Sequence, residues 1–206
     1  MTYSLNTLAR PGKKSEAGAA RTTPRFLNEF ALVIGGAALV YWLVALVSYS
    51  AQDPSFSSSG TGAPVANWAG RLGAWLADGS YFLFGFSVWW CFVAGVRAWL
   101  AMLARWMRGG VDSVPGFWRT RLAFWIGLAV LLCASTGLEW SRLYRLEARL
   151  PDHAGGALGY LIGPAGVKWL GFTGSGLVFV ALVVLGAALV FRFSWGHVAE
   201  RVGARI

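Results

Sequence analysis

The chain has 206 residues, of which 56% are hydrophobic and only 13% are charged, and it contains 12 tryptophans and 27 glycines. Its mean hydropathy of +0.54 excludes an ordinary soluble domain, which would need a far more charged surface at this length. The composition suits a bilayer, where lipid surrounds the outside of the protein. The net charge of +9 would also suit nucleic-acid binding, so the positions of the basic residues decide its meaning.

The first long apolar run, at residues 30–47 (FALVIGGAALVYWLVALV), predicts a membrane-spanning helix. At about 1.5 Å per residue the run covers about 27 Å, close to the thickness of a hydrocarbon core. A long polar segment precedes it and no small-residue cleavage site follows, so we interpret it as an uncleaved anchor rather than a signal peptide. Serines and then Asp53-Pro54 end the helical region, and we expect the first span at 30–49.

Between the first two spans the sequence predicts an outer loop at residues 50–74 and the start of a helix that enters from the membrane interface. Four apolar residues fall at helical spacing on one side of that helix: Trp68, Leu72, Trp75 and Leu76. The second span is expected at 75–103. Arg97 lies within it, and its long side chain can reach toward the nearer interface without breaking the helix.

The third and fourth spans are expected at 120–138 and 171–193, joined by a second outer loop at 139–170. In the first part of this loop, leucines recur at three- and four-residue steps while charged residues fill other positions, which predicts an interfacial helix on the outer leaflet. The leucines are Leu143, Leu146 and Leu150, and the charged residues are Arg142, Arg145, Glu147 and Arg149.

A glycine stripe follows in the same loop, where Gly155, Gly159 and Gly163 recur every four residues until Pro164 interrupts the stripe. If the segment is helical, the stripe lets a neighbouring helix or a second protomer approach closely. The segment is too short to span, so it would re-enter or skim the membrane. The alternative is a connector with no packing partner. The predicted fold is an all-α membrane protein with four transmembrane helices, an outer interfacial helix and this glycine-rich segment.

The basic residues give the orientation, since 13 of the 18 Lys and Arg residues lie in the two tails or near the link between the second and third spans. By the positive-inside rule, these parts and both termini face the cytoplasm. We expect a flexible basic tail at 1–25, a membrane domain at 26–193, and a second tail or the start of a linker at 194–206. The net charge is then a topology signal, and we expect no specific nucleic-acid binding by this chain.

Patterns that would carry catalysis or ligand binding are absent from the sequence. It has no phosphate-binding loop of the G-x-x-x-x-G-K-[ST] type and no H-E-x-x-H motif. Cys91 and Cys133 sit inside apolar runs without metal-ligand spacing, and we interpret His153 and His197 as solvated. We therefore expect no catalytic residue, cofactor or metal in this chain. A small transporter is the physical alternative, although the uncharged cores of the spans lack the ionisable residues that line transport paths.

Three stretches match a family pattern: LVSYSAQDPSF at 46–56, NWAGRLGAWLADGSYFLFG at 67–85 and LPDHAGGALGYLIG at 150–163. The first fills a Ser-Tyr-x-x-x-Asp-Pro-Ser pattern with Ser48, Tyr49, Asp53, Pro54 and Ser55. The second fills an element that leads to Phe-Gly with Asn67, Gly70, Gly73, Ala74, Ala77, Asp78, Phe84 and Gly85. Over residues 25–193 the chain resembles the N-terminal four-span region of FtsK/SpoIIIE-type bacterial DNA translocases. A proline common after the Phe-Gly is missing, which leaves the shape of the second helix open.

The resemblance implies an anchor in the bacterial inner membrane, at the division septum, that tethers an ATP-driven DNA pump and contacts other division proteins. It also implies a homo-oligomer, a hexamer, surrounded by the lipid bilayer. ATP and Mg would belong only to a motor downstream, and because the chain ends at Ile206 it is either a fragment or a relative without the motor. The runner-up is a stand-alone small transporter or a membrane-complex subunit. Structural or interface roles are expected for ten residues: Asp53, Pro54, Asn67, Gly70, Gly73, Asp78, Gly85, Gly155, Gly159 and Gly163.

Overall fold

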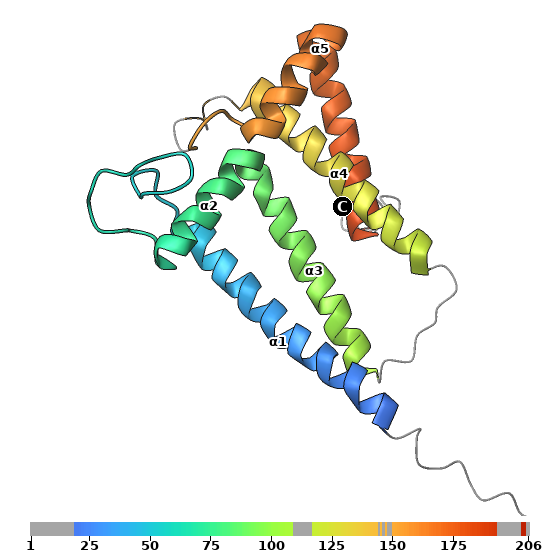
Figure 1. Ribbon diagram of the computed structural model, residues 1–206. Coiled ribbons are helices and arrows are strands. Elements are labelled where there is room, and N and C mark those ends of the chain that lie inside the picture. The colour runs from blue at the N-terminus through green and yellow to red at the C-terminus, as the bar shows by residue number, and fades with distance from the viewer. Residues whose placement is uncertain are drawn as a thin grey trace, which may run out of the picture.

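The computed structural model describes residues 19–108, 117–143, 145, 147, 150–192 and 203–204, which form helices and loops without a β-strand among them (Figure 1). The helices are α1 (Ala19–Val47), α2 (Gly70–Phe84), the short 3-10 helix η1 (Gly85–Ser87), α3 (Val88–Met107), α4 (Phe117–Arg142) and α5 (Gly156–Phe191). Four helical segments are long and apolar enough to cross a membrane: Phe26–Val47, Gly70–Met107, Arg121–Arg142 and Gly156–Phe191. The prediction of an all-α protein with four spans is confirmed.

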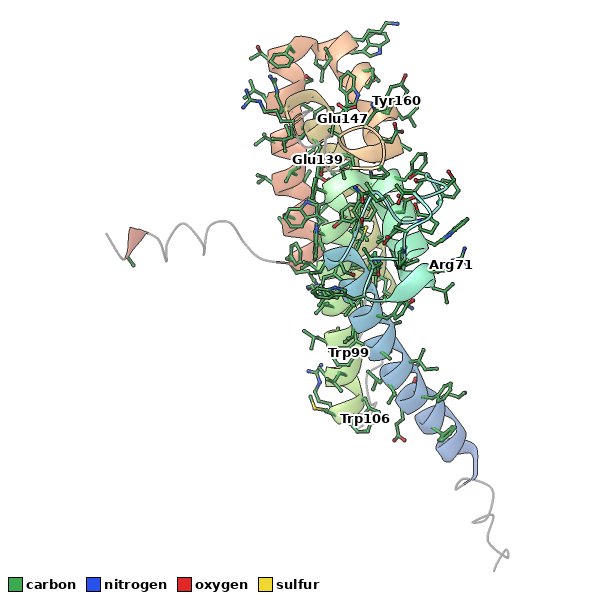
Figure 2. The ribbon with its side chains drawn as sticks, turned by 90° about the vertical axis from the view of Figure 1, so that its left-hand side faces the viewer. Arg71, Trp99, Trp106, Glu139, Glu147 and Tyr160 are labelled. Atoms are coloured by element: carbon green, nitrogen blue, oxygen red, sulfur yellow. The ribbon has the colours of Figure 1, made fainter. Side chains whose placement is uncertain are left out.

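The helices form two groups, α1 with α2 and α3, and α4 with α5 (Figure 1). Between α1 and α3, the indole Nε1 of Trp99 donates to the carbonyl of Leu32 at 2.9 Å. Residues 48–69 and 150–155 lie at one end of the helices, which we call the loop end. The opposite end, where α3 stops and α4 starts, is the arginine end. Figure 2 shows Glu139 and Glu147 toward the loop end, and Trp99 and Trp106 toward the arginine end.

The second predicted span is not one straight helix, because the chain bends at Gly85 between α2 and α3 (Figure 1). Gly85 has φ 56° and ψ −146°, a backbone conformation that residues with a Cβ rarely adopt. The bend turns α2 back against the last part of α1, where Tyr41 donates to the carbonyl of Ala69 at 2.8 Å. With 20 residues and a length of about 30 Å, α3 matches the hydrocarbon core without α2.

The glycine-rich segment is the first half of α5, and the helix continues through Pro164. The expected interruption at Pro164 is wrong, because the break comes at Gly171, whose φ of 68° and ψ of 174° reverse the chain. Proline has a helix-compatible φ, whereas the Gly171 conformation is accessible mainly to glycine. After the break, residues 172–191 run back along α4, so Gly166 and Gly137 both lie against the ring of Phe179. The two halves of α5 make a helical hairpin (Figure 1).

The predicted tails and loops differ from the structure at their edges. Residues 19–25 belong to α1 rather than to a flexible tail, since adding residues to an existing helix is easy once it has formed. The outer loops are shorter than 50–74 and 139–170, because α2 begins at Gly70, α4 extends to Arg142 and α5 begins at Gly156. The expected interfacial helix around Leu146 and Arg149 lies partly outside the described residues. Residues 1–18, and all of 194–206 except 203–204, are outside them too.

Large apolar side chains cover much of the surface. The predicted apolar stripe is exposed: Trp68, just before α2, and Leu72 on α2 are both 78% accessible. Ala74, Ala77 and Tyr81 on the other face of α2 are buried. So much exposed apolar area would make a protein in water aggregate, but a bilayer solvates it. This surface and the four long apolar segments make the chain a multi-pass membrane protein.

Candidate functional site

A buried carboxylate, Asp53, closes the first loop. Its Oδ1 accepts a hydrogen bond from the backbone N–H of Ala66 at 2.8 Å, and its Oδ2 accepts one from that of Asn67 at 2.9 Å. The side chain is only 3% exposed, so these charge-assisted bonds replace the water it has lost. They bring the two ends of the segment 53–66 together. Beside them, Gly60 has φ 78° and lies against Pro54, where a Cβ would be 2.8 Å from the proline nitrogen.

Asn67 joins the end of α1 to the start of α2. Its Nδ2 donates to the carbonyls of Ala45 at 2.9 Å and Ser48 at 3.3 Å, which have no partner further along the helix. Its Oδ1 accepts from the N–H of Ala69 at 2.9 Å, just before α2 begins. Gly73 must lack a side chain because a Cβ there would lie 2.6 Å from this same Oδ1. Gly70 starts the helix with φ 68°, in open space.

Asp78 holds the middle of the same loop from α2. It is 1% exposed, and its Oδ2 accepts from the backbone N–H of Ser57 at 2.7 Å. Its Oδ1 accepts from the hydroxyls of Ser57 at 2.8 Å and Tyr49 at 3.3 Å. Asp53, Asn67 and Asp78 therefore form one group, here called the first-loop cluster, that fixes residues 48–69 to α1 and α2.

A second buried carboxylate, Glu139 near the end of α4, joins the two helix groups. Its Oε2 accepts from the N–H of Phe86 at 2.9 Å, and its Oε1 accepts from the hydroxyl of Ser87. The Gly155 amide faces the same carboxylate, which is 7% exposed. Glu139 thus binds η1 and the start of α5 at once. The sequence analysis did not single out Glu139, which is the first residue of the expected outer loop 139–170, although an acidic residue directly after an apolar span was a usable signal.

The glycines of the predicted stripe pack in the same junction, against α4 of this chain. A Cβ on Gly159 would lie 2.6 Å from the carbonyl oxygen of Thr136, and one on Gly163 would overlap the Trp140 ring. Gly155 lies against the Thr136 carbonyl, and a Cβ on Gly85 would lie 2.7 Å from the Cα of Gly155. The stripe therefore has a packing partner within the chain, which is the close backbone approach that small residues permit.

Exposed ionisable groups lie on the second loop beside this junction. The ring Nδ1 of His153 is 2.7 Å from a Glu147 carboxylate oxygen, and the ring stacks on Tyr160 with centroids 4.9 Å apart. The hydrogen bond to Glu147 raises the pKa of His153, so its positive charge persists to a higher pH than in water. Both partners are nearly half exposed, so the pair contributes little to stability.

The buried polar side chains of the loop end make structural hydrogen bonds. Both oxygens of Asp53, Asp78 and Glu139 accept hydrogen bonds, and every described buried side-chain nitrogen or oxygen has a partner. Within the described part of the chain, no three acidic, histidine or cysteine side chains gather where a metal ion would bind. What the arrangement does is fix residues 48–69 to α1 and α2, and hold η1 and the start of α5 against α4.

We expect Asp53→Ala to destabilise the protein by about 1–3 kcal/mol, because the buried N–H groups of Ala66 and Asn67 lose their acceptor. The free energy of unfolding, measured by denaturant titration in detergent micelles, checks this. Gln52→Ala is the matched control, since its side chain is exposed in the same loop. Equal stability of the two variants would contradict the assigned role of Asp53.

We expect Gly159→Ala to destabilise by about 1–3 kcal/mol, the usual cost of overpacking a tight contact. The control is Gly79→Ala on α2, where a Cβ meets nothing within 4 Å. That change removes a helix-interior glycine and should stabilise by up to about 1 kcal/mol. Opposite signs in the same unfolding assay are the expected result, and a neutral Gly159→Ala would show that the two helices separate easily.

The chain is similar in sequence to known proteins over most of its length. Residues 24–203 match the model of the family described as the 4TM region of DNA translocase FtsK/SpoIIIE. The chain is 37% identical over 187 residues to DNA translocase FtsK 2 of Ralstonia nicotianae, a match that covers 88% of this chain and 23% of that protein. No solved structure matches the chain.

Two further relatives give the same result. DNA translocase FtsK of Pseudomonas aeruginosa is 33% identical over 182 residues, or 86% of this chain and 22% of that protein. DNA translocase FtsK 1 of Neisseria meningitidis serogroup A is 34% identical over 165 residues, or 79% and 20%. The chain thus spans less than a quarter of the length of these relatives. With four apolar helices and the family match over most of its length, the chain belongs to the FtsK/SpoIIIE family of DNA translocases, as their four-transmembrane region.

Proposed function

We propose that this chain anchors a DNA translocase at the division septum, where it tethers the ATP-driven motor and contacts other division proteins during chromosome segregation. The observation that carries the proposal is the family match across residues 24–203. The motor, with its ATP and Mg, would belong to the part of the relatives that this chain does not match. The hexameric assembly of such a motor would make the anchor a homo-oligomer.

The fixed shape of the loop end supports a role in recognition. The first-loop cluster and Glu139 place four polar side chains in buried positions, and each one orders backbone that would otherwise move. A loop held in one conformation binds a partner without the entropy loss of ordering. Exposed aromatic residues on this end, such as Phe56 at 58% and Tyr160 at 58%, provide apolar contact area.

The orientation is part of the proposal. The positive-inside rule assigns the arginine end and both termini to the cytoplasm of a bacterial inner membrane, and the loop end to the outside. A motor that follows the last span would then meet DNA. The transporter alternative has no specific observation in its favour, because Asp78 and Glu139 are occupied by structural hydrogen bonds.

A fluorescent protein fused after Ile206 tests the septal role. The parent fusion should be enriched at midcell in dividing cells, and Asp53→Ala combined with Asp78→Ala should spread evenly around the membrane at equal abundance. Gln52→Ala should behave as the parent. An evenly distributed parent would sink the proposal, whereas unchanged enrichment of the double variant would remove the loop end from recognition.

Cysteine labelling tests the orientation. In a background with Cys91→Ala and Cys133→Ala, single cysteines at Ser58, Gly110 and His153 are exposed to a membrane-impermeant maleimide on intact spheroplasts. Ser58→Cys and His153→Cys should react from outside, and Gly110→Cys should react only after the membrane is opened. Outside labelling of Gly110→Cys would reverse the assigned topology.

A further inference from the structure

A groove of about 910 Å³ opens between the two helix groups toward the arginine end. Helices α1, α3 and α4 line it, and so does Arg192, which directly follows α5. Five arginines line the groove: Arg97, Arg105, Arg108, Arg121 and Arg192. None of the described residues that line it is acidic, and arginine is the only charged residue type among them.

The groove exists because the two helix groups are offset. Arg97 is near the middle of α3, yet it lies close enough to Arg192, at the end of α5, for the two like charges to repel each other. The last half of α3 therefore extends past the end of α5. Its side chains there, including Trp99 and Met102, line the groove instead of packing against the α4–α5 pair.

Two features make Arg97 and Arg192 the centre of the site. Arg97 lies close to Arg192, which directly follows the last membrane-spanning helix, so the pair lies at the level where that helix leaves the bilayer. Arg192 has φ 54°, and no other described residue apart from glycines has a positive φ. Glycine usually fills this position at a helix end, so an arginine there is unfavourable for the backbone. The two like charges repel each other, and an anion between them would remove this repulsion.

The rest of the groove is apolar. Small residues of α1 and α3, among them Gly35, Ala38 and Ala98, line the part of the groove that we call its floor. Phe124 and Trp125 on α4 form the opposite wall. A phosphate diester joined to an acyl chain matches both parts, since basic pockets between transmembrane helices on the cytoplasmic side bind anionic headgroups. A free phosphate would leave the apolar floor empty.

We propose that this groove binds an anionic phospholipid of the surrounding bilayer, with its phosphate between Arg97 and Arg192 and an acyl chain along the floor. Arg108, which also lines the groove, adds positive charge near the headgroup. The bound lipid neutralises the arginine pair and fills the space between the two helix groups. This site is independent of the proposed septal function, which depends on the loop end.

Native mass spectrometry of the whole chain in a neutral detergent tests the proposal. The probes are phosphatidylglycerol and phosphatidylcholine with identical acyl chains, and inorganic phosphate as a competitor. The test variant is Arg97→Gln with Arg192→Gln. Its matched control is Arg71→Gln with Arg145→Gln, which removes the same charge from exposed positions toward the loop end. Far-ultraviolet circular dichroism confirms that each variant is folded.

The parent and the control should retain phosphatidylglycerol at least tenfold more strongly than phosphatidylcholine, and the test variant should lose this preference. A further variant, Ala38→Trp, keeps the arginines but fills the floor, and should weaken phosphatidylglycerol binding while the helix content stays unchanged. Equal retention of both lipids by the parent, or an unchanged preference in the test variant, would overturn the proposal. Displacement of the lipid by millimolar inorganic phosphate would assign the groove to a free anion instead.

Discussion

Buried carboxylates that accept hydrogen bonds from backbone amides are the constraint on which the loop end depends. An ionised side chain out of water is costly unless its oxygens are occupied, and Asp53, Asp78 and Glu139 each find donors in a segment far away in the sequence. The requirement works in both directions, because loop N–H groups near a membrane also need acceptors. The loops are therefore fixed by electrostatics, where an apolar core alone would leave them several conformations.

Glycines are also required, because these hydrogen bonds form only where the backbones of neighbouring segments come close together. Gly85, Gly155 and Gly159 meet where η1, α4 and α5 cross, and a methyl group at any of them would overlap a neighbouring backbone. In the same way Gly186 lets α5 approach Leu131 of α4 near the middle of the pair. Lipid gives helices no hydrophobic reason to associate, so close packing of this kind has to hold them together.

The sequence predicted the parts that follow from composition and local pattern. Long uncharged runs revealed four spans, and Asp53 marked the end of the first one. Asn67 and Asp78 were expected to matter only because they fill a motif of the family that the chain resembles. The roles of Glu139 and Gly171 could not be predicted in this way. Glu139 accepts a hydrogen bond from an amide 53 residues earlier. The sequence alone does not show that these two segments lie close together in space. Likewise Pro164 attracts attention as a helix breaker, yet only the tertiary contacts determine that the chain reverses at Gly171 instead.

The two helix groups also touch beyond the Glu139 junction. At the junction, the α4–α5 pair meets η1 and the end of α2 (Figure 1). Further toward the arginine end, Ala94 of α3 packs with Leu131 of α4 and with Ala187 and Val190 of α5. Arg97 lies about one helical turn beyond Ala94, and Arg192 follows Val190 closely. The groove between these arginines therefore begins where direct packing of α3 against the α4–α5 pair ends.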